Sequence, residues 1–402
     1  MKAFFSAMSP RRRHLVLLVI IYIGFISLGL PDTVLGVAWD SMRRELGTPV
    51  YYAGFLTTLL TICSAVSAFF SGEILRRTGT GRLLMICGFV TGCSLLGYAF
   101  SPAFWCLLLF AIPLGFGQGA VDTGMNYYVA RHYTSRDMSW LHCCWGLGAS
   151  CGPGLVTLIL ASGGSWRWGY VTVGAIQLGL ALLFSLTLGL WSDPEGGDEK
   201  KTAFAEGTVR FCLRFWFCPL MMLLYCGIEF SMGLWVYQFL AGCRGFSAEA
   251  AGYAVAGYWG MLTAGRFLIG CVANRLGNRR QIRLSMVLSF TGALLLTVPG
   301  PAALILCAVG LIGFAFASFY PAMMHAAPER FDDVTAATVI GYQGGAAMLG
   351  AAVIPAAFGY LAARTTFALL PWFVAAVTVV IFLLQLRVPR LQKPDSMEDY
   401  RP

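Results

Sequence analysis

Long apolar stretches separated by short polar segments run along the whole chain. A helix needs about 20 mostly apolar residues to cross a bilayer, and twelve stretches approach or exceed this length. They are residues 14–37, 51–71, 82–100, 103–130, 138–160, 167–190, 213–241, 248–272, 283–299, 302–325, 334–360 and 366–388. The pattern predicts an all-α membrane protein with twelve transmembrane helices. The first stretch is too long for a cleaved signal peptide, so we expect it to be the first span.

The composition agrees with a lipid environment. The chain is 58% hydrophobic and only 12% charged, whereas a soluble domain carries roughly a quarter charged residues. Such a chain cannot cover its apolar surface in one soluble core, so the lipid bilayer is an expected partner. The net charge of +9 is spread over short clusters, which is typical of orientation signals, and we expect no nucleic-acid partner.

Lysine and arginine alternate between rich and poor loops. The rich loops include Arg11–Arg13, Arg76, Arg77, Arg82, Arg275, Arg279 and Arg280, and the other loops hold only Arg43, Arg44, Arg167, Arg244 and Arg364. Positive loops face the cytoplasm. The alternation therefore predicts a multi-pass protein of the cytoplasmic membrane with both termini in the cytoplasm.

A constant offset relates the two halves of the chain. Gly72 and Gly270 are 270 − 72 = 198 positions apart, and the same offset pairs Arg77 with Arg275 and Gly79 with Gly277. The most polar stretch lies between these halves. We therefore predict an N-terminal six-helix bundle at 1–191, a cytoplasmic linker at 192–212 and a C-terminal six-helix bundle at 213–402. Parallel six-helix repeats are an architecture of secondary transporters, with substrate handled between the halves.

The loop after the second span reads Gly72-Glu73-Ile74-Leu75-Arg76-Arg77-Thr78-Gly79, and a related loop follows the eighth span. The pattern resembles the signature loop of the major facilitator superfamily. That family usually has an aspartate where Arg76 stands, and Glu73 is the expected substitute. The resemblance implies a two-bundle major facilitator fold. We expect gating roles for Gly72, Glu73, Arg77, Gly79, Arg266, Gly270, Arg275 and Gly277, with Arg266 near the cytoplasmic end of its span.

Few ionisable residues lie inside the spans, where each costs roughly 2.5–3.5 kcal/mol even on a lenient scale. Asp32, Asp122 and Glu229 are the candidates for proton coupling. Pro31 frees backbone groups and can break the first span beside a cavity. The offset of 198 pairs Asp32 with Phe230, next to Glu229, and so predicts two acids at nearly the same depth. The alternatives are a wetted end position for Asp32, a helix-holding contact for Asp122 and an arginine partner for Glu229.

A second set of residues suits the binding of a polar substrate. Asp122 and Asn126 are four apart, which places them on one helix face, where a carboxylate and an amide suit hydroxyl groups. Aromatic rings stack on sugar rings. The predicted substrate-binding residues are Asp122, Asn126, His142, Trp145, Trp235, Tyr237 and Gln343. A structural role for His142 is the open alternative, because a lone histidine is often a satisfied donor.

Four short segments are similar to the fucose-permease-like sugar/proton symporters within that superfamily. These are the segment around Asp32, the Asp122 to Asn126 segment, the Leu141-His142 segment ending in Gly152-Pro153, and the acid-then-Gly-Trp pattern of Glu229, Gly233 and Trp235. The resemblance implies Asp32 as the coupling acid, and Asp122, Asn126 and His142 as sugar-cavity residues. His142 departs from the amide side chain of that branch.

Two functions compete. The first is proton-coupled symport of a monosaccharide or similar small polar metabolite by alternating access. The second is a proton-driven exporter of amphipathic compounds, which the methionines at 221, 222, 323 and 324 keep open. A third class, a membrane enzyme or a transport-inactive sensor, has less support. No nucleophile elbow, phosphate loop or pair of metal ligands is present, and the longest linker is too short for a sizeable soluble output domain. We expect no cofactor and no metal, a proton or a sodium ion as the coupling ion, and a monomer.

Overall fold

The structure is a computed structural model that describes residues 9–133, 135–191, 213–327, 330–331 and 333–388. The described elements are helices throughout, and the all-α class is confirmed. The first half of the chain forms α2 (Pro10–Glu45), α3 (Tyr52–Thr78), α4 (Thr80–Ala99), α5 (Phe104–His132), α6 (Ser135–Ala161), α7 (Trp166–Leu186) and η1 (Leu188–Leu190). The second half forms α8 (Leu213–Cys243), α9 (Ala248–Leu276), α10 (Asn278–Thr297), α11 (Ala302–Phe316), α12 (Phe319–His325), α13 (Asp333–Arg364), η2 (Phe367–Leu369) and α14 (Leu370–Arg387).

Each of the twelve predicted spans has a helical counterpart. Within the described residues, nine helical segments are long and apolar enough to cross a membrane, and one of them combines α11 and α12. The other three counterparts are α3, α9 and α10, which are 27, 29 and 20 residues long. The predicted linker, 192–212, lies outside the described residues.

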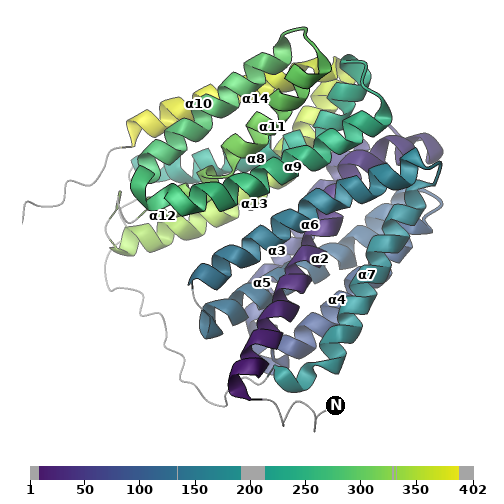
Figure 1. The fold of residues 1–402 in the computed structure, drawn as a ribbon, viewed down its shortest axis with the longest axis vertical. Coiled ribbons are helices and arrows are strands. Elements are labelled where there is room, and N and C mark those ends of the chain that lie inside the picture. Colours follow the sequence, from purple (N-terminus) through teal and green to yellow (C-terminus); the bar gives the residue numbers. More distant parts are fainter. Residues whose placement is uncertain (1–8, 134, 192–212, 328–329, 332, 389–402) are drawn as a thin grey trace, which may run out of the picture.

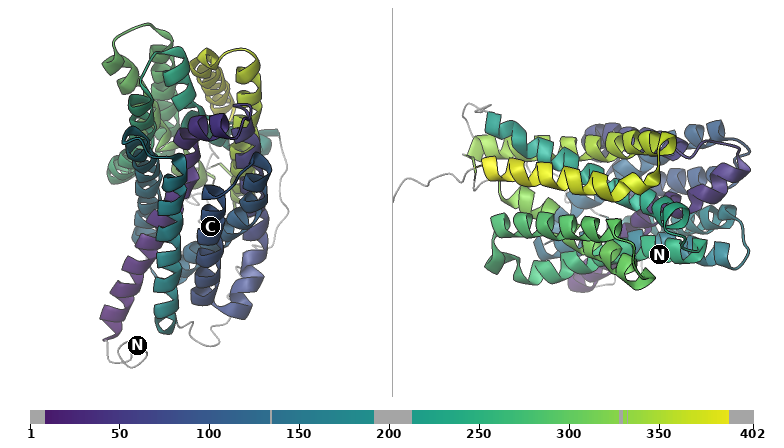
Figure 2. Two further views of the ribbon diagram at one scale, coloured as in Figure 1. Left: turned by 90° about the vertical axis from the view of Figure 1, so that its right-hand side faces the viewer. Right: turned by 90° about the horizontal axis from the view of Figure 1, so that it is seen from above.

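The helices pack as two bundles (Figure 1). In the N-terminal half, α2 packs against α6, α3 against α5, and α4 against α5 and α7. In the C-terminal half, α8 packs against α13, α9 against α11, and α10 against α11 and α14. Figure 2 shows the bundles from two further sides. The halves meet mainly where α6 packs on α9 and α3 on α13.

Close contacts join the halves at one end of the molecule. We call the end at which α2 begins the base, and the end at which α2 ends the top. Towards the top, Gly36 of α2 lies against the carbonyl group of Gly233 in α8. The Thr58 hydroxyl in the upper part of α3 donates to the Ala352 carbonyl oxygen of α13 at 2.6 Å. The two halves therefore contact each other through the upper parts of these helices.

The loops repeat with the predicted offset. Gly47 and Gly245 have φ of 62° and 69°, and Gly79 and Gly277 have φ of 74° and 70°. Glycine is required at such positions because other residues clash in the left-handed region. Both pairs are 198 apart (245 − 47 and 277 − 79), so matching turns carry matching backbone conformations.

The helix interiors follow a different offset in one place. Gly152 of α6 lies against the carbonyl oxygen of Leu30, and Gly350 of α13 lies against the carbonyl oxygen of Leu223. The glycines are 350 − 152 = 198 apart, but their partners are only 223 − 30 = 193 apart. At this level, the residue of α8 that is equivalent to a residue of α2 lies 193 positions later in the chain. This offset is five residues shorter than the 198 that relates the loops and that relates α6 to α13.

This shorter offset corrects the expected pairing of acids. The contacts place Tyr225 (32 + 193), not Phe230, at the position equivalent to Asp32. Glu229 lies four residues further along α8, which is about 6 Å of helix rise at 1.5 Å per residue. The two acids are therefore not at the same depth, because the loop-derived offset does not hold inside α8.

Candidate transport site

Pro31 lies in the middle of α2, and the helix continues through it. The break that a proline can cause is therefore absent at Pro31. Proline has no N–H to bond the carbonyl group four residues earlier, which here is that of Ser27. The Gln177 side chain of α7 donates to this Ser27 oxygen at 2.8 Å. A neighbouring helix thus satisfies the freed carbonyl group, and α2 stays helical next to Asp32.

The carbonyl group freed by Pro153 in α6 is also satisfied by a side chain of a neighbouring helix. This carbonyl group is that of Ala149, which accepts a hydrogen bond from the Thr33 hydroxyl at 2.7 Å. Thr33 follows Asp32 directly, so this bond fixes α2 against α6. Gly29 also lies directly against the backbone of α6 at Trp145. These contacts hold Asp32 and Trp145 next to each other.

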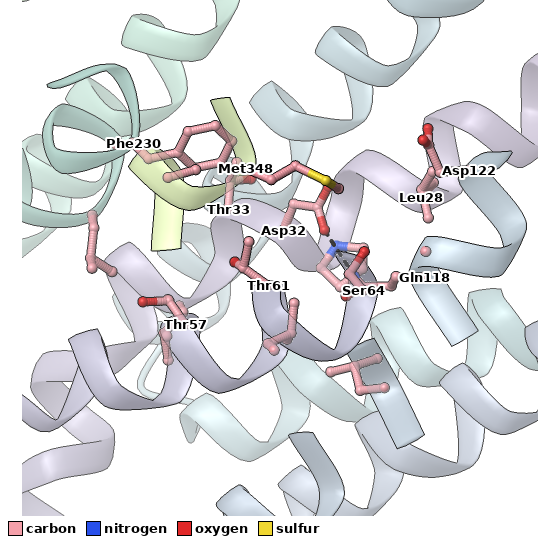
Figure 3. Close-up of a pocket in the computed structure, with 18 of the residues that line it drawn as sticks. Leu28, Asp32, Thr33, Thr57, Thr61, Ser64, Gln118, Asp122, Phe230 and Met348 are labelled. Carbon is pink, nitrogen blue, oxygen red and sulfur yellow. Dashed lines mark hydrogen bonds between the residues drawn. The ribbon is translucent and has the colours of Figure 1, made fainter. Parts of the chain in front are cut away.

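A cavity of about 350 Å³ lies between the halves, below the contacts at the top. Its N-terminal wall is rich in polar groups, and Figure 3 shows several of them around Asp32, with Phe230 and Met348 on the other side. The polar residues of that wall include Asp32, Thr57, Thr61, Ser64, Gln118, Asp122 and Trp145. The C-terminal wall is mostly apolar and includes Cys226, Phe230, Leu234, Trp259, Tyr320, Ala347, Met348 and Ala351. The cavity thus has two chemically different walls.

Asp32 is exposed to the cavity although it lies well inside a membrane-spanning helix. The amide of Gln118 donates to its Oδ1 at 2.8 Å, and the indole N–H of Trp145 donates to its Oδ2 at 2.8 Å. The carboxylate is therefore held by two neutral donors from α5 and α6. Gln118 escaped the sequence analysis, although it lies four residues before Asp122, on the same helix face.

Asp122 and Asn126 contact each other on α5. The Asn126 amide donates to Asp122 Oδ1 at 3.1 Å and to the Asp122 carbonyl oxygen at 2.9 Å. Asp122 lines the cavity, and Asn126 does not. Asp122 also interacts electrostatically with Asp32. The polar wall therefore carries two neighbouring acids.

Glu229 lies in a different setting in the C-terminal half. It is 3% exposed, and its Oε1 lies 3.5 Å from a guanidinium nitrogen of Arg266. Arg266 was expected near the end of its span, but it lies ten residues before Leu276 (276 − 266), beside the ring of Trp145. The pair is buried, and neither residue lines the cavity.

Tyr225, the counterpart of Asp32, donates its hydroxyl to the carbonyl oxygen of Phe316 at 2.7 Å. Phe316 ends α11, and the tenth span resumes at Phe319. This interruption was not predicted. Pro321 was the available signal, because a proline ring clashes with the carbonyl group four residues before it, here that of Ala317.

Other predicted substrate-binding residues lie away from the described cavity. His142 is exposed one turn before Trp145, with its ring edge-on to Phe25 at 5.8 Å. Trp235 is buried and donates to the Pro355 carbonyl oxygen at 2.8 Å. Their assignment to the binding site stays a prediction.

Tyr237 and Gln343 also lie outside the cavity lining. Tyr237 is buried near Asp40 towards the top of α8. Gln343 is fully buried in α13, and neither of its amide atoms has a hydrogen-bond partner among the described residues.

Apart from Arg266, the predicted gating residues lie around the loops at the base. Gly79 and Gly277 have the left-handed backbone described above, and Arg275 is exposed in the last turn of α9. The positions 72, 73 and 77 lie in α3 and 270 lies in α9. The side chains of Glu73 and Arg77 are outside the described part of the structure, and the gating roles stay predictions.

Comparison with known proteins decides the family. The model of the Major Facilitator Superfamily matches residues 21–257 and 217–399. This chain belongs to the Major Facilitator Superfamily. The predicted two-bundle fold is thereby confirmed. Like other members of this superfamily, the chain is a multi-pass membrane transporter and not an enzyme.

Three relatives show how far the similarity extends. The chain is 24% identical to the probable sulfoacetate transporter SauU of Cupriavidus necator, over 91% of each chain. Its fold is similar to that of a mutant of the nucleoside transporter NupG, with a TM-score of 0.76 at 15% identity over 94% of this chain and 99% of that one. A bacterial homolog of the human lysosomal transporter Spinster, inward-facing and occupied, gives a TM-score of 0.73 at 14% identity over 95% and 98%. The fucose-permease-like branch stays a prediction.

Proposed function

We propose that this superfamily member is a proton-coupled symporter of a small, uncharged polar metabolite such as a monosaccharide, moved by alternating access between the two halves. The observation that carries the proposal is the position of Asp32. This carboxylate lies inside a membrane span, faces the cavity between the halves and is held by two neutral donors.

The contrast with Glu229 supports a proton role for Asp32. A charged acid inside a membrane span costs free energy, and such residues usually have a functional role. Glu229 has a cationic partner in Arg266. Among the described contacts, no cation pairs directly with Asp32. A proton is the simplest ion to neutralise this exposed acid, and Asp122 beside it is the second candidate.

The chemistry of the walls supports an uncharged cargo. Hydroxyl, amide and carboxylate groups on the N-terminal wall offer donors and acceptors to hydroxyl groups of a substrate. No lysine, arginine or histidine lines the described cavity. An anion such as sulfoacetate, the cargo named for the relative in Cupriavidus necator, would face two acids here without a compensating charge.

One observation favours a second candidate, a proton-driven exporter of amphipathic compounds. The C-terminal wall presents Phe230, Trp259 and Met348 in place of polar groups. Such a wall suits a solute with one apolar face. Methionine and aromatic side chains also adapt to ligands of different shape.

The proposal includes the membrane location, the orientation and the oligomeric state of the protein. Location in the cytoplasmic membrane with both termini in the cytoplasm follows from the loop charges. In this orientation the described contacts at the top lie on the outer side, and the cavity lining extends to Ala68, ten residues before the end of α3 (78 − 68), and to Gly344, eleven residues after the start of α13 (344 − 333). We propose a monomer, because the cavity is formed by the two halves of one chain.

The test begins with purified protein and a thermal-shift screen of monosaccharides, nucleosides, sulfoacetate and lipophilic cations. A bound solute raises the melting temperature by mass action. Each hit is then offered to proteoliposomes with an imposed proton gradient, with Asp122→Asn as the site variant. Proton-driven accumulation of a monosaccharide supports the proposal, whereas accumulation of sulfoacetate without any sugar hit contradicts it. Extrusion of lipophilic cations supports the second candidate.

A further inference from the structure

Trp145 contacts charged groups in both halves of the molecule. Its indole N–H donates to Asp32 Oδ2 at 2.8 Å. The guanidinium carbon of Arg266 lies 5.8 Å from its ring centroid, and its ring meets that of Trp259 edge-on at 5.9 Å. Asp32 belongs to the N-terminal half, and Arg266 and Trp259 belong to α9 of the C-terminal half. A single side chain thus connects the cavity acid with the other bundle.

The strength of one of these contacts depends on the charge of Asp32. A hydrogen bond to an ionised carboxylate is roughly twice as strong as one between neutral groups. An ionised Asp32 therefore holds the indole ring firmly, and a protonated Asp32 holds it weakly. The ring in turn attracts Arg266 through its face. Arg266 also pairs with Glu229 at 3.5 Å. A movement of the Trp145 ring therefore changes how the Arg266 guanidinium divides its interactions between the ring and Glu229.

We propose that Trp145 is the positioning residue that transmits proton binding at Asp32 to the contact between the two halves, through Arg266 and Glu229. The inference rests on the proposed role of Asp32 as the proton-binding acid. It assigns to Trp145 a role in coupling that does not depend on stacking against a substrate.

Among the described contacts, none of the surrounding ionisable groups is hydrogen-bonded to Asp32, whose donors are Gln118 and Trp145. The ionisable side chains that line the cavity with Asp32 are Tyr98 on α4, Asp122 on α5, Tyr170 on α7, Cys226 on α8 and Tyr320 on α12, whereas His142, Glu229 and Arg266 lie outside the lining. Asp122 is hydrogen-bonded to Asn126 of its own helix and also interacts electrostatically with Tyr320 of the other half. His142 packs on Phe25 and interacts electrostatically with Arg266, but it has no hydrogen bond or ion pair with Asp32 among the described contacts. Glu229 and Arg266 both lie in the C-terminal half. Among the contacts of the described residues, Trp145 joins Asp32 to a charge on the opposite half.

The test uses the proton itself as the probe and needs no identified substrate. Spin labels are placed through non-canonical amino acids at Arg82 and Arg280, which are exposed near the starts of α4 and α10 at the base, one in each half. Pulsed electron paramagnetic resonance in nanodiscs then gives the distance between the halves as the pH changes. The comparison includes wild type, Asp32→Asn and Trp145→Phe. Trp140→Phe is the matched control, because it makes the same change five residues earlier on α6, at an exposed tryptophan whose edge-on ring contact with Phe267 of α9 does not need the N–H.

In the wild type and in the Trp140→Phe control, we expect pH to change the ratio of the distance populations by roughly 5- to 150-fold, the usual range of coupling between two sites. Trp145→Phe, which keeps a ring but removes the N–H, should lose most of that change, as should Asp32→Asn. If Trp145→Phe does not fold, benzothienylalanine at position 145 removes the N–H while keeping the bicyclic shape.

The outcomes separate the two proposals. A Trp145 variant with wild-type pH dependence overturns the role of Trp145 and leaves that of Asp32 standing, provided that Asp32→Asn is insensitive to pH. An Asp32→Asn protein that responds to pH like the wild type overturns the proton role of Asp32, and with it the inference. A wild type without pH dependence overturns both.

Discussion

The position of Asp32 in α2 and the equivalent position of Tyr225 in α8 carry different chemistry on the same scaffold. Each side chain forms a hydrogen bond to another helix of its own bundle, Asp32 with Gln118 and Tyr225 with the Phe316 carbonyl oxygen. The residues at 118 and 316 are again 198 apart (316 − 118). Asp32 faces the cavity as an ionisable group, whereas Tyr225 is buried and supports a helix interruption.

This difference shows that the repeat preserves backbone contacts more strictly than side-chain chemistry. The N-terminal half supplies the cavity with acids and hydrogen-bonding groups. The C-terminal half supplies an apolar wall, and its one acid at this level among the described residues, Glu229, is neutralised by Arg266. Proton chemistry is therefore expected to depend on the N-terminal half, and changes at equivalent positions should have unequal effects.

The largest expected effect is that of Asp32→Asn. The variant keeps the size of the side chain and removes the proton-binding group, so proton-driven accumulation should fall to the level of protein-free vesicles. Solute-driven counterflow, which needs no net proton movement, should remain. Uptake by proteoliposomes under an imposed proton gradient measures the difference. Proton-driven accumulation by Asp32→Asn at the wild-type rate would contradict the expectation that proton binding depends on the N-terminal half.

The second effect concerns the ion pair of the C-terminal half. Arg266→Gln leaves Glu229 buried without its partner, which should destabilise the protein by about 3–5 kcal/mol. Removing both charges with Glu229→Gln in the same chain should recover much of that loss. Thermal unfolding in detergent checks this double-mutant cycle. Equal stability of Arg266→Gln and wild type would show that the pair is not a structural feature.

The third effect tests the shared backbone contacts. A Cβ atom added at Gly152 or Gly350 would overlap the carbonyl oxygen of Leu30 or Leu223. Each Gly→Ala change should therefore destabilise its own bundle by about 1–3 kcal/mol, and the two should cost similar amounts. Gly344→Ala is the control, because nothing lies within 4 Å of the added atom. Destabilisation by only one of the two changes would contradict the equivalence of Leu30 in α2 and Leu223 in α8.

The smallest effect is expected for Tyr225→Phe. Loss of the hydroxyl leaves the Phe316 carbonyl oxygen without this donor, at a cost of about 1 kcal/mol. Melting temperature and the pH dependence of transport are the measurements, and only the first should change. A Tyr225→Phe protein that loses proton-driven uptake would assign coupling chemistry to both halves.

Hydropathy predicted the helices well because lipid exposure demands continuous apolar stretches. The predicted span at 103–130 matches α5 (Phe104–His132), and that at 248–272 matches α9 (Ala248–Leu276). The acids inside the spans were also identified from sequence, because few ionisable residues occur there. The loop glycines revealed the repeat, since left-handed turns restrict the residue type.

The remaining features depend on contacts between distant segments. Pro31 leaves α2 intact because Gln177, 146 positions away (177 − 31), satisfies the freed carbonyl group. The shifted register of α8 is invisible to an offset derived from loops. Trp145 was assigned to sugar stacking, and its link between Asp32 and Arg266 exists only in three dimensions.

The central claim, that Asp32 is the proton-binding group of the cavity, is tested most directly by infrared titration of the protein in nanodiscs. The absorption of protonated carboxyl groups is recorded as the pH is lowered, for wild type, Asp32→Asn and Glu229→Gln. The account predicts a carboxyl band that is present in the wild type and in Glu229→Gln and is absent from Asp32→Asn. An Asp32→Asn spectrum that keeps the full wild-type band would contradict it.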